Sequence, residues 1–454
     1  MPWPTCEIVC GKIRKFSGRQ TPVLFGSGEE ASQAGERFLV YRGFTVKMDP
    51  LSLIACLPHS SHHFDGSEEE LNSCSSMEEE IWRKLPQELL ERILASLPLP
   101  SLLRLCTVCK CWNSLFMSPK FLELRTDLFC SQKPCYLMSA FVVQKTVGFA
   151  FFNPVLKIWH QMLMPGSLWA EGQHNNSHHQ PALVASDSGL LLLGFGEPQV
   201  PYVYDSYVVC NPVTGAVKKV PPVQSVGLRS CIGFLANSSA KTFKIITAWN
   251  VTGTMDLTTE IYDSATGNRI ETANEFSPVV APTDCHQSGV FCNGFMYVIS
   301  REPMMLVGLD IEKYSWSEIV RVPDFIMRPH LIERFGCLMV VGGVDNIFSH
   351  SRSPNPQSIG IWKLNPVQRE WIEVERLPKA LCQELQKWIN FVEFQCLGQH
   401  DILYLSSKGG RDVLAYSLSN KSWHWLPDAP MTAVHPGNPW WMPVPFEPSM
   451  SAEV

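Results

Sequence analysis

Few residues in this chain combine the types and the spacing that catalysis or metal binding requires. The closest approach is the set Cys106, Cys109 and Cys111, because thiolates spaced in this way can bind zinc or exchange disulfides. No second pair of Cys or His stands at zinc-ligand spacing, and the three thiols fall inside a run of short helical patterns. We therefore interpret them as thiols of a helical core.

Histidines and glycines elsewhere give weaker signals. His174, His178 and His179 share one polar stretch, which we interpret as a solvated loop rather than a metal site. The segment Gly194-Phe195-Gly196 lacks the third glycine and the strand–helix context of a phosphate-binding loop. Neither G-x-S-x-G nor H-E-x-x-H occurs in the sequence. The sequence thus predicts no catalytic residue, no cofactor and no metal, and we expect a protein that is not itself an enzyme.

The elements that stand out are three short helical patterns between residues 77 and 125. The first begins at Pro86, whose missing N–H costs nothing in the first turn of a helix. Its apolar residues recur every three or four positions and form one stripe, which ends at Pro98. Ser101 can cap the second pattern, and the third covers residues 108–116.

These patterns hold more large apolar side chains than so small a unit can cover. A helical unit of roughly 45 residues buries too small a fraction of its surface to be stable alone. Burying one such side chain stabilises a fold by about 1.5–3 kcal/mol at most, so an uncovered half of the set would form a strongly adhesive patch. The stripe fits either a helical lead-in that packs on the next domain or a docking surface for another protein.

The sequence of this segment resembles an F-box. The resemblance rests on L-P-x-E-L-L-x-x-I-L-x-x-L-P from residue 85, L-L-R-L from residue 102 and V-C-K-x-W-N from residue 108. It implies three helices that dock onto a Skp-type adaptor of a cullin–RING ubiquitin ligase. The resemblance also implies, by position, which residues contribute to adaptor docking or to contacts among the helices. They are Leu85, Pro86, Leu89, Leu90, Ile93, Leu94, Leu97, Pro98, Leu102, Leu105, Val108, Cys109 and Trp112.

Composition narrows the possible partners of the whole chain. Hydrophobic residues make up 45% of the 454 residues and charged residues 18%, so most of the chain should pack into a core. The net charge of −6 argues against a general nucleic-acid binder, and no apolar run reaches the length of a membrane span. The 16 cysteines are scattered and no secretory leader opens the chain, so we expect reduced thiols in a cytoplasmic or nuclear protein.

From about residue 134 onward, short β-rich runs alternate with turn residues, and they contain an internal repeat. Asn, Asp or, in the last unit, Ser ends an extended apolar run, and in four of six units tryptophan follows six residues later. Asn and Asp favour a tight turn by bonding to their own following backbone, while tryptophan can pack between neighbouring units. The pairs are Asn153 and Trp159, Asn211 and Val217, Asp263 and Arg269, Asp310 and Trp316, Asn365 and Trp371, and Ser417 and Trp423.

A period of about 50 residues, built of strand, turn and strand, is typical of propeller blades. The repeat resembles kelch repeats, in which a turn acid precedes a tryptophan, although Val217 and Arg269 depart from that pattern. The double glycine of kelch repeats is clear only at Gly342-Gly343. We expect a mainly β fold with a kelch-like propeller of six blades, closed by strands near residues 134–143 beside the last unit.

Together these features resemble the plant F-box/kelch-repeat proteins. The resemblance implies the substrate-recognition subunit of an SCF (Skp–cullin–F-box) ubiquitin ligase, which binds the adaptor, through it the cullin and RING subunits, and an unidentified target protein. Loops are the usual recognition elements on rigid scaffolds, so loops 165–182 and 345–358 are candidates for target contacts. The domains we expect are a largely disordered tail (1–76), the F-box helices (77–125), the propeller (130–430) and a C-terminal strap (431–454).

Two other functions fit the same sequence features. An F-box/kelch protein could act as a transcriptional co-regulator or scaffold without causing degradation of a target. A propeller can also carry an enzyme, such as a copper oxidase, although a single sequence cannot show side chains converging on a central channel.

Overall fold

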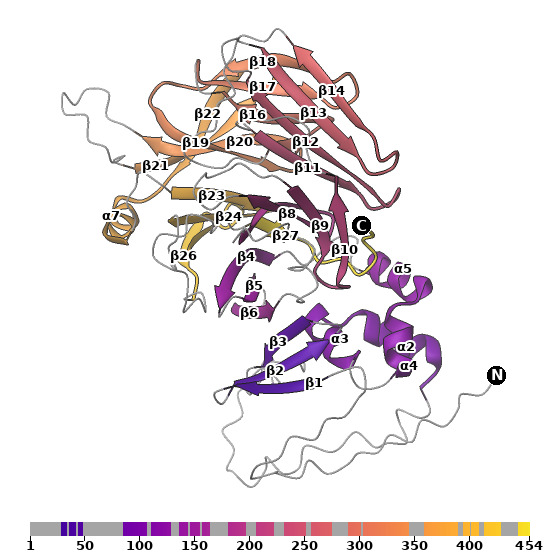
Figure 1. Ribbon diagram of the computed structural model, residues 1–454. Coiled ribbons are helices and arrows are strands. Elements are labelled where there is room, and N and C mark those ends of the chain that lie inside the picture. Colours follow the sequence, from indigo (N-terminus) through magenta and orange to yellow (C-terminus); the bar gives the residue numbers. More distant parts are fainter. Residues whose placement is uncertain are drawn as a thin grey trace.

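The structure of the chain, a computed structural model, contains a helical unit beside a β-propeller (Figure 1). Within the described part of the chain, no helix is long and apolar enough to cross a membrane. The structure describes residues 29–33, 36–41, 44–48, 85–106, 110–128, 136–143, 146–154, 157–163, 180–196, 206–221, 231–250, 256–274, 289–300, 303–344, 358–388, 394–399, 401–407, 413–427 and 444–454.

Five antiparallel sheets of four strands each follow one another along the chain, as blades of a propeller do. Within each sheet the strands lie side by side in sequence order, so every connection inside a sheet is a hairpin. The strands are β7 (Gln180–Asp187), β8 (Leu190–Gly196), β9 (Ser206–Asn211) and β10 (Ala216–Val220); β11 (Cys231–Asn237), β12 (Thr242–Asn250), β13 (Leu257–Asp263) and β14 (Arg269–Asn274); β15 (Val290–Cys292), β16 (Phe295–Ile299), β17 (Met305–Asp310) and β18 (Ser315–Arg321); β19 (Ile326–Arg334), β20 (Cys337–Val344), β21 (Ser358–Asn365) and β22 (Glu370–Arg376); and β23 (Phe394–Gln399), β24 (Ile402–Ser407), β25 (Val413–Ser417) and β26 (Ser422–Trp425).

The remaining strands of the described chain form one seven-stranded sheet, in the order β1-β2-β3-β6-β5-β4-β27. Its members come from three distant parts of the sequence, and three of them lie in the region for which we expected no fold. They are β1 (Glu29–Gln33), β2 (Glu36–Tyr41), β3 (Phe44–Met48), β4 (Tyr136–Val143), β5 (Thr146–Asn153), β6 (Ile158–Leu163) and β27 (Val444–Phe446).

The prediction of six like blades was therefore wrong. Five four-stranded blades form, and β4 to β6, which we assigned to a further blade, belong to the seven-stranded sheet. The predicted position of the closing strands beside the last unit is confirmed, because Phe152 packs in one cluster with Leu426 and Trp159 bonds Pro427. The pairing of β4 with β27 from the C-terminal region, with Val444 opposite Met138 and Phe446 opposite Tyr136, was not predicted. The two ends of the propeller sequence thus meet within one sheet, in which β27 covers the edge of β4.

The turn residues of the repeat each end the strand that precedes the last strand of their unit, at β5, β9, β13, β17, β21 and β25. Asn211 Oδ1 accepts a hydrogen bond from the backbone N–H of Val213 at 2.9 Å. Asp310 Oδ1 accepts two, from the N–H groups of Glu312 and Lys313, each at 3.0 Å. The predicted Asn and Asp turns are confirmed at these positions. In each turn the side-chain oxygen accepts hydrogen bonds from backbone N–H groups that would otherwise lack an acceptor.

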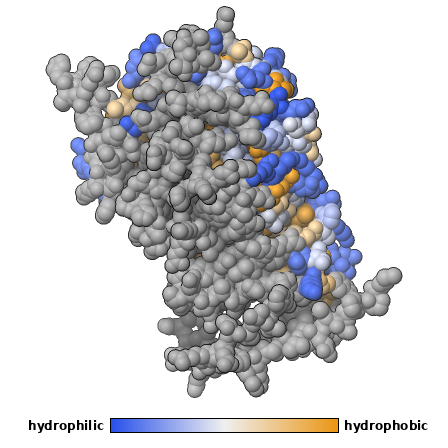
Figure 2. All heavy atoms as spheres, viewed as in Figure 1, coloured by the Kyte–Doolittle hydropathy of each residue, from blue (hydrophilic) through white to orange (hydrophobic). Residues whose placement is uncertain are grey.

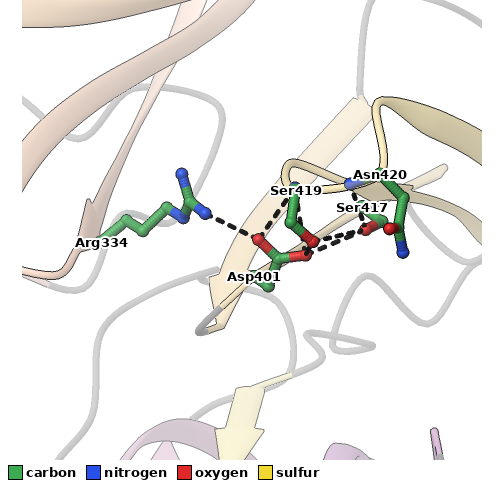
Figure 3. Close-up of polar contacts among 5 residues, drawn as sticks. All are labelled: Arg334, Asp401, Ser417, Ser419 and Asn420. Atoms are coloured by element: carbon green, nitrogen blue, oxygen red, sulfur yellow. Dashed lines mark hydrogen bonds and ion pairs between the residues drawn. The ribbon is translucent and has the colours of Figure 1, made fainter.

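The last unit replaces the acid by Ser417 and supplies a carboxylate from a different hairpin. Asp401, between β23 and β24, accepts hydrogen bonds from Ser417 Oγ at 2.9 Å and from Ser419 N at 3.0 Å (Figure 3). Arg334 of the preceding sheet pairs with the same carboxylate at 2.6 Å. The turn after β25 is thus held by an acid that the repeat pattern does not contain.

Tryptophans of the repeat bind the neighbouring sheet as well as pack against it. Trp159 Nε1 donates to the carbonyl oxygen of Pro427 at 2.8 Å, and Trp371 Nε1 donates to that of Arg321 at 3.2 Å. Both carbonyls lie at or just beyond the end of the outermost strand of the preceding sheet. The predicted packing of tryptophan between neighbouring units is confirmed at these two positions, where the indole also fixes the relative position of two sheets.

Arg269 makes a comparable link where tryptophan is missing. Its guanidinium donates to the carbonyl oxygen of Pro221, which directly follows β10 of the preceding sheet, and it also pairs with the buried carboxylate of Glu260. Because a guanidinium offers several donors, it can bond a neighbouring carbonyl and a carboxylate together. The departure from the repeat at Arg269 therefore keeps the connection between sheets.

Apolar side chains between adjacent sheets form the core of the propeller. Between the β11–β14 and β15–β18 sheets, Ile246, Met296 and Val307 are fully buried. On the side of the molecule shown in Figure 2, the described surface is mostly hydrophilic, with smaller apolar patches between. This distribution is expected for blades that cover their faces by stacking on one another.

The described part of the C-terminal region, residues 444–454, continues from β27 across the β7–β10 sheet. Asn211 Nδ2 donates to the carbonyl oxygens of Ser449 and Ala452, each at 2.8 Å. The side chains of Met450 and Ala452 are buried. Asn211 therefore makes two kinds of contact: its Oδ1 stabilises the turn after β9, and its Nδ2 binds the C-terminal segment.

Among its described residues, the helical unit contains one helix more than predicted. Its second helix begins at Leu99, so Ser101 is not its cap, and Pro100 lies in the first turn, where a missing N–H is tolerated. The fourth helix follows Ser118, which accepts the Phe121 N–H at 3.3 Å. The four helices are α2 (Gln87–Ala95), α3 (Leu99–Leu105), α4 (Lys110–Phe116) and α5 (Pro119–Leu128), and a further helix, α7 (Lys379–Trp388), connects β22 to β23.

Candidate functional site

Helix α2 presents apolar side chains on two different faces. Leu89 and Ile93 lie one turn apart and keep 50% and 42% of their surface exposed. Leu94 and Ala95, on the other side, are buried at 4% and 0% exposed. Only part of the apolar stripe recognised in the sequence is therefore buried in the core, and the rest of it faces solvent.

The inner part of the stripe packs into the core of the helical unit. Leu94 and Leu102 belong to one cluster with Phe116 of α4 and Phe121 of α5, whose rings lie 5.1 Å apart between centroids. Aromatic rings at this spacing add to the free energy gained by burial alone. Residues that are partly buried against the same cluster include Leu90, Leu97, Leu105 and Trp112.

Helix α5 fixes the C-terminal end of α2 through Arg125. The Arg125 Nη1 atom donates to the carbonyl oxygens of Ala95 and Leu97, each at 2.8 Å. The last carbonyls of a helix have no partner within the helix, so a cation here satisfies them and also suits the negative end of the helix dipole. The orientation of Leu89 and Ile93 thus depends on a residue about thirty positions further along the chain.

A buried carboxylate lies on the opposite side of α2 from the exposed pair. Glu91 is only 6% exposed, and its Oε1 accepts a hydrogen bond from Gln87 Nε2 at 2.7 Å. Lys120 of α5 lies 3.9 Å from the other carboxylate oxygen. Because a buried carboxylate needs such partners, these contacts tie the N-terminal half of α2 to α5.

The helical unit and the propeller share one apolar core. The cluster that contains Leu94 and Phe121 continues through Val213, Phe446 and Met450 of the propeller and C-terminal region. A pocket of about 110 Å³ at this junction is lined by α5 residues, by Ser188 and Ser238, and by residues 447–451. The helices are therefore packed on the propeller, close to its β7–β8 and β11–β12 hairpins.

The structure separates the thirteen predicted docking residues into groups. Leu94 and Leu102 are core residues, whereas Pro86, Leu89, Ile93 and Pro98 are exposed. Val108 and Cys109 lie outside the described residues, and the others are partly buried. A role for any of these residues in adaptor docking stays a prediction.

Helix α5 and its two cations were not predicted from the sequence. The signal for the helix was present, because Ser118-Pro119 is a favourable helix start and residues 121, 122 and 124 are apolar. The roles of Arg125 and Lys120 were not readable, since both depend on how α5 crosses α2.

Most thiols of the described chain are buried, whereas its histidines differ: His330 is buried, His160 is partly buried and His424 is exposed. Burial raises the pKa of the Cys210 and Cys231 thiols to about 12, so both stay protonated and unreactive at neutral pH. Cys106 is buried in the helical core and Cys111 is half-buried. Among the described residues, no group of three His, Cys, Asp or Glu side chains could hold a metal ion, and His174, His178 and His179 lie outside them.

Comparison with known proteins gives matches to both parts of the chain. Residues 82–124 match the F-box domain, and residues 149–430 match the F-box associated beta propeller domain.

Several curated plant proteins are similar over most of their length. An F-box/kelch-repeat protein of Arabidopsis thaliana is 27% identical, over 86% of this chain and 93% of its own length. The protein UNUSUAL FLORAL ORGANS of the same species is 25% identical, over 78% of this chain and 80% of its own. SKP1-interacting partner 15, also from Arabidopsis thaliana, is 23% identical, over 76% of this chain and 92% of its own.

Proposed function

The chain belongs to the family of F-box proteins with an F-box associated β-propeller, and from this premise we propose that it is the substrate-recognition subunit of an SCF-type ubiquitin ligase. In this role the F-box helices bind a Skp-type adaptor, which connects the chain to the cullin and RING subunits. The propeller binds the target protein. One relative is named for its interaction with SKP1, which supports an adaptor of this type.

The observation that carries the proposal is the pair of exposed apolar side chains on α2. Leu89 and Ile93 are about half exposed, whereas most large apolar residues of the described chain are buried. Covering the exposed half of both would contribute about 2 kcal/mol to binding a partner. The pair is held in place by Arg125, Lys120 and the core below, so little conformational entropy is lost when a partner covers it.

The chain's contribution to catalysis in this role is positional. Ubiquitin transfer takes place on the separate RING–E2 module, and the chain raises the effective concentration of a target lysine beside it. No residue of the chain acts as nucleophile or general base in this role. The partners are proteins, with no nucleic acid and no membrane among them, and the place of action is the cytoplasm, the nucleus or both.

The proposal is tested by assembling the complete ligase from purified adaptor, cullin, RING subunit and full-length chain. We expect one stable complex on size exclusion, and a candidate target that is ubiquitinated only when the chain is present. In cells, the half-life of that target should shorten when the wild-type chain is expressed, and not when the Leu89→Arg, Ile93→Arg variant is. A scaffold or co-regulator would bind the adaptor without changing the half-life of any protein that it binds.

A further inference from the structure

Two sets of hairpins in the propeller lie on one face. In a four-stranded antiparallel sheet, the first and third hairpins fall at the same end of the strands. Contacts between sheets join these ends: Asn293 Nδ2 donates to the carbonyl oxygen of Gly336 at 3.2 Å, and Arg334 pairs with Asp401 at 2.6 Å. We call this face the turn face.

Three neighbouring units carry a long basic side chain at the same position of their last hairpin. Lys157, Arg369 and Lys421 each stand four residues after the turn residue of the repeat, and all three are exposed. Their φ angles are 53°, 52° and 49°, in the left-handed region that glycine prefers. The β7–β10 and β11–β14 sheets have glycine there, at Gly215 and Gly267, with φ angles of 76° and 71°.

The three basic residues lie on three consecutive sheets of the ring. The β19–β22 sheet contacts the β23–β26 sheet through Arg334 and Asp401, and the next unit contacts β23–β26 through Trp159 and Pro427. Lys157 is close enough to His424, on β26, to lower the pKa of that imidazole, although burial is the larger cause. The turns themselves read P-V-L-K, P-V-Q-R and L-S-N-K. The nearby carboxylates are Glu370, which directly follows Arg369, and Asp401, which bonds Ser419 and is paired with Arg334.

An exposed aromatic residue lies on the same face of the propeller as these three residues, which we call the basic arc. Phe335 is 70% exposed at the tip of the β19–β20 hairpin, with a φ angle of 47°. A bulky side chain in the left-handed region is a clear exception to backbone preferences. The corresponding hairpin of the β15–β18 sheet has Asn293-Gly294 in the same conformation, and asparagine is well suited to it.

The Phe335 hairpin is held rigidly by its surroundings. Glu333 Oε1 accepts the Gly336 N–H at 2.6 Å, and the Arg334 guanidinium lies 5.2 Å from the centre of the Phe335 ring. The charge of Arg334 is balanced by Asp401 (Figure 3). Burial raises the pKa of Asp401, but bonds from Ser419 and Ser417 and the charge of Arg334 outweigh it, so that the pKa is lowered and the group stays ionised.

The third hairpin of the β19–β22 sheet also exposes an apolar side chain. Val367 is 89% exposed there, two residues before Arg369. Unlike Arg334, none of the three basic residues of the arc has an ion-pair partner among the described residues. The surface therefore offers a fixed aromatic anchor, an aliphatic contact and three available positive charges, in backbone positions where glycine or asparagine would cost less.

We propose that Phe335, Val367, Lys157, Arg369 and Lys421 form a docking surface for an acidic protein segment that also carries apolar residues. The positive arc would steer and orient carboxylates, and the apolar side chains of the segment would cover Phe335 and Val367. The inference rests on the proposed function in one respect, namely that this segment belongs to the protein brought for ubiquitin transfer. The helical unit packs on hairpins of the same face, at β7–β8 and β11–β12, so a protein docked there would lie on the ligase side of the propeller.

The neighbouring sheets supply variants that should not harm the fold. Replacing Lys157, Arg369 and Lys421 together by glycine copies Gly215 and Gly267, and Phe335→Asn copies Asn293. Each change relieves an unfavourable backbone position, so thermal unfolding should occur at the same or a higher temperature. If these residues served only to stabilise the turns, both variants would melt earlier, and the proposal would be overturned.

The binding test uses the full-length chain in complex with its adaptor and a short fluorescein-labelled peptide of glutamate, leucine and glycine. By fluorescence anisotropy at low ionic strength, this peptide should bind, and its affinity should fall by about tenfold or more with either variant. A peptide with lysine in place of glutamate should not bind, and one with serine in place of leucine should lose its dependence on Phe335. Equal binding to the wild type and both variants, or no binding of the acidic peptide, would refute the proposal.

Two further measurements distinguish the docking of an acidic segment from nucleic-acid binding and from a failure of the ligase function. A single-stranded oligonucleotide that binds more tightly than the peptide, and loses affinity in the triple glycine variant, would contradict the inference by assigning the arc to nucleic acid. The adaptor itself reports on the proposed function: its binding must be the same in wild type, triple glycine variant and Phe335→Asn. If the adaptor fails to bind the wild-type chain while the acidic peptide binds, the proposed ligase function is contradicted and the proposed docking surface is supported.

Discussion

Arg269 donates a hydrogen bond to the carbonyl oxygen of Pro221, and so joins the β11–β14 sheet to the preceding one. Where the repeat has tryptophan, Trp371 joins its own sheet to the carbonyl of Arg321 in a similar way. The propeller is thus stabilised by a donor at one repeated position, whether the donor is an indole or a guanidinium. The pattern explains how a degenerate repeat can still build regular sheet-to-sheet contacts.

Removing the Arg269 side chain should destabilise the propeller by about 3 kcal/mol, because it also leaves the buried carboxylate of Glu260 without its cation. Urea unfolding of Arg269→Ala measures this loss. A second change, Glu260→Gln, should recover part of it, since no buried charge then remains. The matched control is Arg376→Ala at the exposed pair with Glu373, which should cost less than about 1 kcal/mol. Equal losses at both sites would show that the connection between sheets contributes little.

Asn211→Asp should release the C-terminal region while leaving the turn intact. The carboxylate keeps the acceptor for the Val213 N–H, but it cannot donate to Ser449 and Ala452. Limited proteolysis should therefore cut residues 447–454 sooner than in the wild type. Asn365→Asp is the control, because Asn365 holds an equivalent turn and makes no bond to that region. Protection of the segment in both variants would mean that the Asn211 amide does not hold it.

Local patterns predicted local structure well. The Asn and Asp turns and the packing of Trp159 and Trp371 between sheets follow from residue chemistry at fixed spacing. The pairing of β4 with β27 joins residues about three hundred positions apart, and a strand of three residues leaves almost no pattern to read. The same limit explains the wrong blade count, because β4 to β6 look like any other unit until their neighbours are known.

His330 makes stability depend on pH. Burial lowers its pKa to about 4, with a smaller contribution from the charge of Arg328, against the opposing effect of the hydrogen bond to the Phe394 carbonyl. Because the folded value lies below the ordinary value of 6.5, the unfolded chain binds a proton between pH 6.5 and 4 that the folded chain does not. Stability should be full above pH 6.5 and fall by up to about 3 kcal/mol toward pH 4.

The His330→Gln variant isolates this contribution, since glutamine can bond the same carbonyl and does not titrate. Unfolding free energies measured from pH 7.5 to 4 should show a shallower decrease for the variant than for the wild type. Parallel curves would show that another group dominates the acid sensitivity.

Arg125→Ala should weaken adaptor binding although residue 125 lies outside the proposed contact surface. The change leaves the carbonyl oxygens of Ala95 and Leu97 without their donor, at a cost of about 1–3 kcal/mol, and lets the end of α2 move. Titration with the adaptor should show a lower affinity, while the propeller's thermal transition stays the same. Arg125→Lys, which can satisfy one carbonyl, should be intermediate. An unchanged affinity in Arg125→Ala would mean that α5 does not orient the docking helix.

The sequence predicted which segment contains the candidate site, but it did not predict which side chains of that segment are exposed. Helical spacing identified the stripe that contains Leu89, Ile93 and Leu94, but spacing alone cannot say which side the rest of the chain covers. That choice follows from α5, whose Phe121 and Arg125 occupy the other side of α2. The docking surface proposed around Phe335 was missed for a similar reason, because left-handed backbone positions at Lys157, Arg369 and Lys421 become visible only in the folded chain.

The role of α2 in adaptor docking is tested most directly by the affinity of a purified Skp-type adaptor for the full-length chain, measured beside the Leu89→Arg, Ile93→Arg variant. Both side chains are about half exposed, so the variant should melt at the wild-type temperature. Its affinity should nevertheless fall by more than about 100-fold, because two charges would be buried unpaired on docking. Arg92→Glu, an exposed change on the same helix, is the control and should keep most of the affinity. Wild-type affinity in the double variant, or no binding by the wild type, would contradict this role.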